Sequence, residues 1–150
     1  MRNRNKTISE STINKRLKQY GFENGDKIIK ILAKAISSNI SEDGFIGHIG
    51  GDDFFVGLTD FAFEDVFKLT LDVQNEFEYS AKNLYSKEDK EIGYIVSKDR
   101  FGTTRNFNLL SVSCSIIEIN SQSNILNFDD TLNSMKKESK SSKEPVYKVL

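Results

Sequence analysis

The chain has 150 residues, with 21 Lys and Arg against 22 Asp and Glu and a net charge of −1. That length suits one compact domain, and the lack of a basic excess argues against nucleic-acid binding as a main role. A single cysteine, Cys114, excludes an intramolecular disulfide framework, and no apolar run is long enough to span a bilayer, so we expect a cytoplasmic domain without membrane contact.

The chain begins with a polar, basic stretch over residues 1–11 that makes a poor strand and lacks the apolar segment of a secretory signal. Residues 12–20 then place apolar side chains three or four positions apart. This spacing predicts a short amphipathic helix that ends at Gly21.

A second helix is predicted after a loop over residues 20–26. Residues 28–36 carry one continuous apolar stripe, and the polar cluster 37–39 ends the helix. Asp26 stands in the first turn, where its carboxylate complements the helix dipole.

Residues 44–58 read GFIGHIGGDDFFVGL and predict a β-hairpin with arms near 45–49 and 53–58. Gly50-Gly51 forms the turn, because a primed turn needs positive φ at both central residues. The paired carboxylates Asp52-Asp53 suit a hard cation such as Mg²⁺, which usually brings substrate phosphates with it. The alternative is a plain acidic hairpin, since Gly-Gly followed by acids is common turn composition.

The middle of the chain predicts one long helix. Asp60 is a candidate N-cap, and apolar residues recur with helical period over residues 63–84. The charged run 86–91 is predicted to be a solvated loop.

The last third predicts a second hairpin, with strands at 93–97 and 107–119 joined across 99–102. A short helix over 129–140 and an edge strand over 146–150 follow. This order of elements predicts an α+β domain in which helices cover a central, mainly antiparallel sheet.

Two motifs in register carry a family resemblance. GGDDF at 50–54, together with YGFENGD at 20–26, resembles the GGDEF domain of bacterial diguanylate cyclases, whose upstream element reads YGHxxGD. Residues 110–113 sit where that family has its TVSIG strand, and Leu132 with Lys136 sits where it has ALYxAK. The resemblance runs from about residue 9 to the end and is closest to the C-terminal GGDEF domains of proteins that also carry EAL and CBS domains.

The resemblance implies a nucleotidyl-cyclase-like fold with a ferredoxin-like core. It also implies condensation of two GTP molecules into cyclic di-GMP by an antiparallel homodimer, with Mg²⁺ ions neutralising the triphosphates.

Site roles follow from the same resemblance. Asp52 is the metal-binding acid, and Asp53 takes the catalytic position linked to metal binding or to activation of the hydroxyl. Gly50 and Gly51 let the backbone approach the nucleotide, and Asp26 falls where the family has a guanine-contacting carboxylate. The alternative for Asp26 is a plain helix-start acid.

Two lysines complete the implied substrate-binding set. Lys136 matches a lysine that contacts phosphates, and Lys140 stands where an arginine is usual; a solvated helix end is the alternative for both. His48, the single histidine, is predicted to be an outward strand residue, because no other histidine exists to help complete a metal site.

Several positions depart from the family pattern. Ser9 replaces a metal-binding aspartate, and Leu17 replaces a guanine-binding asparagine, so neither can do the original job. Residues 1–11 are then a truncated or atypical first strand. Ser115 stands at a glycine position, and Ser41 and Gly44 replace the two ends of the RxxD inhibitory site.

Two hypotheses follow for a single domain over residues 1–150. The favoured one is a degenerate GGDEF module that takes up GTP with Mg²⁺ through Asp26, Asp52 and Lys136, and that regulates a flanking EAL or CBS domain or mediates dimerisation. The alternative is an active diguanylate cyclase, because Asp52 and Asp53 are intact.

Overall fold

The computed structural model describes residues 23–40, 42, 44–98 and 101–150. The predicted helix at 12–20, and the positions Ser9, Leu17 and Ser41, lie outside these residues. None of the helices in the described ranges is long and apolar enough to cross a membrane.

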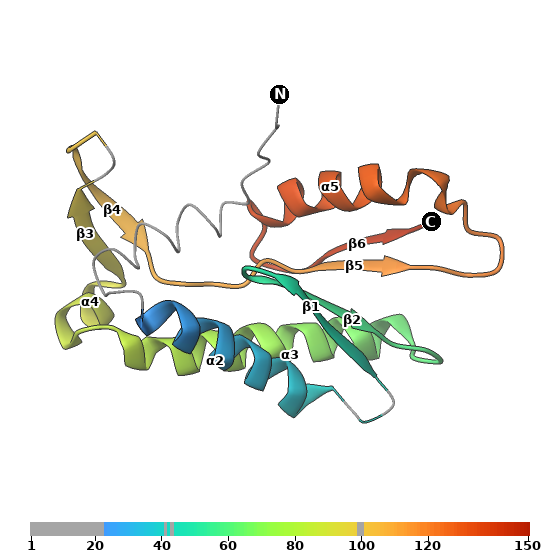
Figure 1. Cartoon of the computed structure of the whole chain (residues 1–150), viewed down its shortest axis with the longest axis horizontal. Helices are drawn as coiled ribbons and strands as arrows, with labels where there is room; N and C mark the ends of the chain where they lie inside the picture. The colour runs from blue at the N-terminus through green and yellow to red at the C-terminus, as the bar shows by residue number, and fades with distance from the viewer. Residues whose placement is uncertain (1–22, 41, 43, 99–100) are drawn as a thin grey trace.

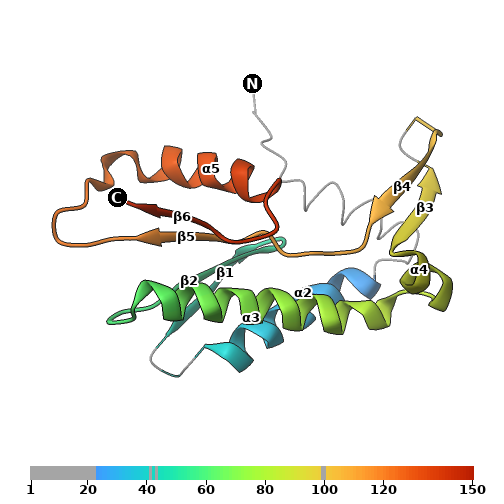
Figure 2. The same cartoon turned by 180° about the vertical axis from the view of Figure 1, so that it is seen from behind.

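Helices and strands are mixed along the described chain, which confirms the α+β prediction (Figures 1 and 2). In order, the elements are α2 (Glu23–Asn39), β1 (Phe45–Gly50), β2 (Asp53–Gly57), α3 (Phe63–Ala81), the 3-10 turn η1 (Lys82–Leu84), α4 (Lys87–Ile92), β3 (Tyr94–Lys98), β4 (Thr104–Asn108), β5 (Ser115–Glu118), the 3-10 turn η2 (Ile125–Asn127), α5 (Phe128–Ser139) and β6 (Val146–Val149).

The strands of the described residues form three two-stranded sheets. β1 pairs with β2 and β3 with β4, both antiparallel, whereas β5 pairs with β6 in parallel. The β3–β4 hairpin stands at one end of the molecule, apart from the other two sheets (Figures 1 and 2). The single central sheet with a ferredoxin-like core therefore stays a prediction.

The strand predicted over 107–119 is wrong as one element. β4 ends at Asn108, and β5 begins only at Ser115. Between them two backbone groups bond to side chains: the Leu110 N–H donates to the Tyr85 hydroxyl at 2.8 Å, and Gln74 Nε2 donates to the Val112 carbonyl at 2.7 Å. The Cys114 carbonyl, next to β5, accepts from the Val146 N–H of β6. Leu109, Leu110 and Val112 pack against the core although they lie outside any strand, which explains why the apolar pattern of this segment resembled a strand.

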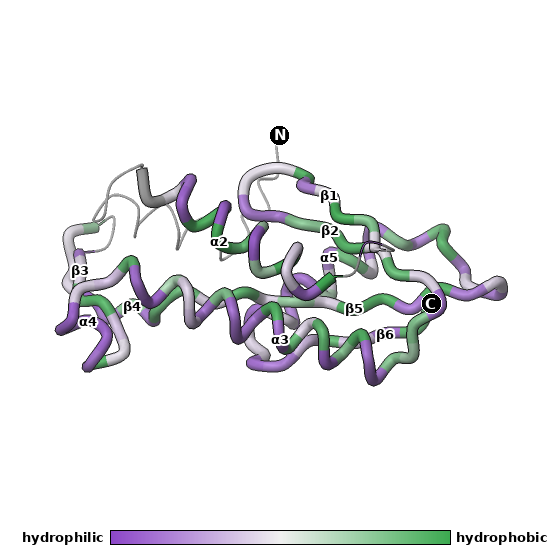
Figure 3. The backbone as a smooth tube through the Cα atoms, turned by 90° about the horizontal axis from the view of Figure 1, so that it is seen from below, coloured by the Kyte–Doolittle hydropathy of each residue, from purple (hydrophilic) through white to green (hydrophobic). Residues whose placement is uncertain are grey.

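The core lies between α2 and α3, which run alongside each other (Figures 1 and 2). α2 buries most of the apolar stripe that the sequence predicted, whereas α3 fully buries only the second half of its predicted stripe. The buried members are Ile28, Leu32, Ala35 and Ile36 from α2 and Val73, Phe77 and Ala81 from α3, joined by Tyr85, Ile95 and Leu110. Figure 3 shows hydrophobic residues along β1 and β2 as well, and Phe54 and Val56 pack against this core.

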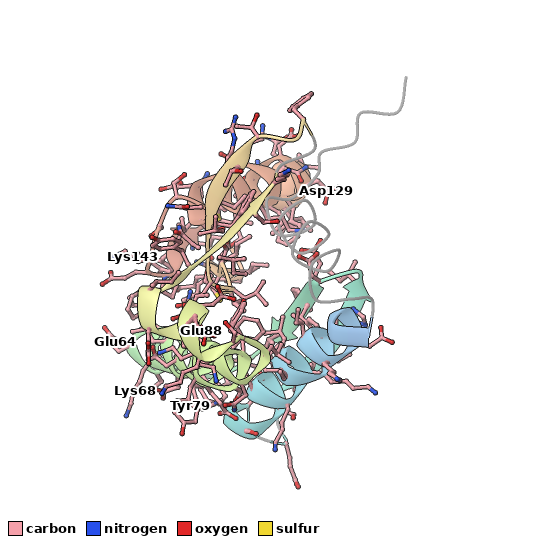
Figure 4. The ribbon with its side chains drawn as sticks, turned by 90° about the vertical axis from the view of Figure 1, so that its left-hand side faces the viewer. Glu64, Lys68, Tyr79, Glu88, Asp129 and Lys143 are labelled. Carbon is pink, nitrogen blue, oxygen red and sulfur yellow. The ribbon has the colours of Figure 1, made fainter. Side chains whose placement is uncertain are left out.

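The outer side of α3 and α4 is polar. In Figure 4, Glu64 and Lys68 of α3 lie on the side turned away from α2, and Glu88 of α4 is exposed as well. The outer face of α3 is thus polar and its inner face apolar, as the helical periodicity predicted.

Three local predictions need correction. α2 begins at Glu23, within the segment predicted as a loop. Asp60 does not cap α3: its φ is 64°, and the N-cap is Ala62, which makes no side-chain bond. The charged run 86–91 is not a loop but lies largely in α4, where the Ser86 side chain accepts a bond from the Asp89 N–H and Gly93 closes the helix with φ 78°.

Candidate functional site

The turn between β1 and β2 has the geometry that its two glycines predicted. Gly50 has φ 133° and Gly51 has φ 60°, and a bulge lies between His48 and Gly50. A Cβ added at either glycine would meet nothing within 4 Å, so their conformation, and not crowding, calls for glycine. The backbone of the turn is therefore open to an approaching group.

The tertiary structure brings α5 to this turn. Lys136 Nζ lies 3.2 Å from Asp53 Oδ2, a contact between residues 83 positions apart. The two side chains are 34% and 37% exposed, so the pair is accessible to a ligand. Of the two hairpin carboxylates, Asp53 is the one that contacts the α5 lysine.

Lys140, one helical turn further along, belongs to the same cluster. Burial lowers the pKa of Lys140, and the positive charge of Lys136 adds to this, while the Asp53 and Asp52 carboxylates act in the opposite direction. Two ammonium groups and two carboxylates thus share one electrostatic environment.

One carboxylate oxygen of Asp52 differs from the other charged atoms of the cluster in its burial and hydrogen bonding. Its Oδ2 is buried and has no hydrogen-bond partner among the described residues, a state that costs free energy in an apolar setting. A carboxylate oxygen held in this way is a suitable ligand for Mg²⁺, which is commonly bound by one or two carboxylates together with substrate phosphates. Among the described residues, no three His, Cys, Asp or Glu side chains gather into a group that could hold a metal ion.

The cluster lines a cavity of about 1230 Å³. Asp52, Asp53, Lys136 and Lys140 are among the polar residues of its wall. The remaining walls come from the apolar faces of α2 and α3, from β2 and from residues 106–119.

Asp26 was predicted to be a site residue, and His48 was predicted to be an outward strand residue. Asp26 is exposed in the first turn of α2 and does not line the cavity. His48 is exposed as predicted, but it also has a local partner: its ring stacks on Phe54 at 4.5 Å, and Nε2 lies 3.0 Å from the Gly51 carbonyl oxygen. His48 and Gly51 are three positions apart, on either side of the turn, and this separation could have suggested the bond.

Ser115 is a cavity residue that sequence reasoning did not place in the site. Its Oγ is buried without a hydrogen-bond partner in the part of the chain that the structure describes, and the residue lines the same cavity as Asp52. The sequence signal was a serine at a position where the resembling family has glycine, but only the fold shows which surface that serine faces.

Comparison with known proteins gives one family match and two relatives that match short parts of this chain. The family described as diguanylate cyclase, GGDEF domain, matches residues 12–103. A diguanylate cyclase of Vibrio cholerae serotype O1 (strain ATCC 39541 / Classical Ogawa 395 / O395) is 34% identical over 59 residues, which are 39% of this chain and 18% of that protein. The signaling protein YkoW of Bacillus subtilis (strain 168) is 42% identical over 40 residues, which are 27% of this chain and 5% of that protein.

These alignments cover only a small part of each relative. No solved structure matches the chain significantly.

Proposed function

The chain belongs to the diguanylate cyclase GGDEF domain family, and from this premise we propose that it is a GGDEF module of cyclic di-GMP signalling that binds GTP at the β1–β2 turn. The observation that carries the proposal is the buried, unpartnered Oδ2 of Asp52 beside Lys136 and Lys140. A triphosphate with Mg²⁺ supplies what this cluster lacks, namely a cation for the carboxylates and anions for the lysines.

Each residue then has a separate part in binding. Asp52 and Asp53 hold Mg²⁺, which when bound neutralises charge on the triphosphate. Lys136 leaves Asp53 and pairs with a phosphate oxygen, and Lys140 adds a second positive charge. The open backbone at Gly50 and Gly51 lets the phosphates come close.

Asp26 has a weaker basis within the proposal. A carboxylate can accept hydrogen bonds from guanine N1 and N2, but Asp26 lies outside the cavity that contains the other members. Its role as the guanine contact rests on the family motif alone.

We favour a degenerate module over an active enzyme. Ser9 and Leu17 stand where the family motif calls for a metal-binding acid and a guanine-binding amide, and loss of such groups commonly costs two to three orders of magnitude in rate. The module then acts as a GTP-binding, regulatory or dimerisation domain within 1–150, joined to partners such as EAL or CBS domains in the cytoplasm. The second candidate, an active diguanylate cyclase, is favoured by the intact pair Asp52 and Asp53.

Calorimetric titration with GTP tests the binding site. We expect binding that requires Mg²⁺ and that weakens at least about tenfold in Asp52→Ala, because a metal ligand is lost. Asp129→Ala, an exposed acid at the opposite end of α5 (Figure 4), is the matched control and should leave the affinity unchanged. Equal affinity of Asp52→Ala and the unmodified chain would refute the site.

A product assay separates the two candidates. Incubation with GTP and Mg²⁺ or Mn²⁺ followed by chromatography should give no cyclic di-GMP if the module is degenerate. Clear product that disappears in Asp52→Ala would establish the cyclase instead. An unchanged GTP affinity in Asp26→Ala would remove Asp26 from the guanine contact without affecting the rest of the proposal.

A further inference from the structure

The side chain of His48 reaches across the β1–β2 turn to the peptide group that precedes Asp52. Its Nε2 lies 3.0 Å from the carbonyl oxygen of Gly51. A carbonyl oxygen can only accept a hydrogen bond, so Nε2 carries the hydrogen and His48 is the donor. The Gly51 carbonyl is therefore held by a side chain to which the GTP site proposed above gives no part.

The His48 ring is itself held in place by Phe54. The two rings stack, with centroids 4.5 Å apart and planes inclined by 14°. Phe54 lies opposite His48 in the hairpin and packs against the core between α2 and α3. The donor nitrogen is thus connected through Phe54 to the most buried part of the domain, although His48 is exposed.

The backbone of the turn needs such a restraint. Gly50 and Gly51 have the widest choice of backbone conformation, and nothing lies within 4 Å of the position of a Cβ at either residue. A bulge between His48 and Gly50 also interrupts the strand ladder next to the turn. Neither packing nor regular pairing therefore fixes the Gly51–Asp52 peptide, whereas the bond from His48 does.

The direction of the Gly51 carbonyl sets the direction of the next N–H. None of the described peptide bonds is cis, so the Gly51 C=O and the Asp52 N–H point to opposite sides of one planar group. Because the carbonyl points to the His48 ring, the Asp52 N–H points away from it. Among the described residues, no backbone carbonyl accepts a hydrogen bond from this N–H.

The two faces of the hairpin show where the Asp52 N–H is directed. His48 and Phe54 are cross-strand partners and share one face. Asp53 precedes Phe54 in β2 and so directs its side chain to the other face, where it meets Lys136. The Asp52 N–H is therefore turned to the side of the Lys136 ammonium group.

A backbone N–H and an ammonium group on one side of a turn are both hydrogen-bond donors. Phosphate oxygens accept from both kinds of donor, and the bonds are strengthened by the negative charge of the acceptor. We propose that His48 is a positioning residue, which holds the Gly51–Asp52 peptide so that the Asp52 N–H donates to a phosphate oxygen of the bound nucleotide. This inference rests on the proposed GTP site and adds to it a backbone donor and a residue that does not touch the ligand.

NMR relaxation of the full chain without nucleotide tests whether His48 fixes the turn. In the unmodified chain, we expect amide order parameters near about 0.85 at Gly51 and Asp52, as in rigid backbone, and a fall toward about 0.6 in His48→Phe. His48→Phe keeps a flat ring against Phe54 but has no donor. His48→Gln should keep the high values, because its amide Nε2 is as many bonds from Cβ as the imidazole Nε2 is.

Calorimetric titration of the same variants with GTP and Mg²⁺ tests the effect on the site. We expect His48→Phe to weaken binding about three- to tenfold, since one hydrogen bond that positions the turn is lost, and His48→Gln to restore most of the affinity. Ile49→Val, at an exposed side chain beside the turn, is the matched control and should bind as the unmodified chain does. A purely structural role of the ring would give the opposite order, with His48→Phe closer to the unmodified chain than His48→Gln.

The Asp52 amide proton reports the assigned donor directly. During the GTP titration it should move downfield in the unmodified chain and in His48→Gln, and clearly less in His48→Phe. GTP binding that leaves this proton unmoved would overturn the donor, and order parameters unchanged in His48→Phe would overturn the role of His48. A chain that binds no GTP refutes the proposed function and the phosphate contact together, while the order parameters still decide whether His48 holds the turn.

Discussion

At the scale of single residues, the Asp53–Lys136 contact and the Asp52 oxygen differ in what they contribute. The ion pair is about one-third exposed on each side, so solvent screens it and its contribution to stability is about 0–1 kcal/mol. The unpartnered Asp52 oxygen instead lowers stability. The ion pair and the Asp52 oxygen therefore add little or nothing to the stability of the fold. This is what we expect if the three side chains serve the ligand binding proposed above.

Cys114 gives a pH-dependent prediction at the same scale. Burial raises the pKa of its thiol to about 12, from an ordinary value of 9.0. Above pH 9 the unfolded state loses this proton while the folded state keeps it, so the thiol's contribution to stability is full below pH 9 and falls as pH rises toward 12.

We expect the free energy of unfolding to fall by up to about 1.4 kcal/mol per pH unit in this window through Cys114 alone. Urea titrations at pH 8.5, 9.5 and 10.5 measure the slope, and Cys114→Ala should remove that part of it. Parallel slopes for the two proteins would show that the thiol is not held neutral by burial.

At the scale of elements, alanine substitutions in the β1–β2 turn measure the free-energy cost of backbone strain without a cost from steric clashes. Gly50 at φ 133° and Gly51 at φ 60° both have free space where a Cβ would stand. Gly51→Ala should cost about 1 kcal/mol, because the left-handed region is only mildly unfavourable for alanine. Gly50→Ala should cost more, about 1–3 kcal/mol, since few non-glycine residues adopt its φ.

Urea unfolding of the two variants measures this difference. Gly57→Ala in β2 is the control: its added Cβ would meet atoms at the ordinary distances of 3.6 and 3.7 Å, and its φ is not positive. We expect Gly57→Ala to be tolerated best of the three. A larger loss in Gly57→Ala than in Gly50→Ala would mean that packing, not turn conformation, governs this hairpin.

At the scale of the whole molecule, the segment between β4 and β5 connects the end hairpin to the rest of the domain (Figure 1). It is held by the bond from the Leu110 N–H to the Tyr85 hydroxyl, both buried, and by the bond from Gln74 to the Val112 carbonyl. These side-chain bonds replace the strand ladder that the apolar sequence of this segment predicted.

Tyr85→Phe tests how much this connection contributes. It leaves the buried Leu110 N–H without its hydroxyl partner and should lower the free energy of unfolding by about 1–3 kcal/mol in urea titrations. Tyr79→Phe, at a side chain that is 76% exposed, should change it by no more than about 0.5 kcal/mol. Similar small losses in both variants would show that water can replace the bond.

The sequence by itself determined the features that depend on near neighbours. The glycine turn with its carboxylates, the apolar stripes of α2 and α3, the helix at α5 and the last strand all follow from spacing and residue type over a few positions. The motif at 50–54 with that at 20–26 likewise indicated the family before any contact was known.

Only the tertiary structure decided the features that depend on distant partners. These are the contact of Asp53 with Lys136, the burial of the Asp52 oxygen, the break between β4 and β5, and the cavity beside them. A strand pairs only where a neighbouring edge is within hydrogen-bond reach, and an oxygen loses water only where another element covers it. Residue type alone contains neither piece of information, because both are set by the packing of the whole chain.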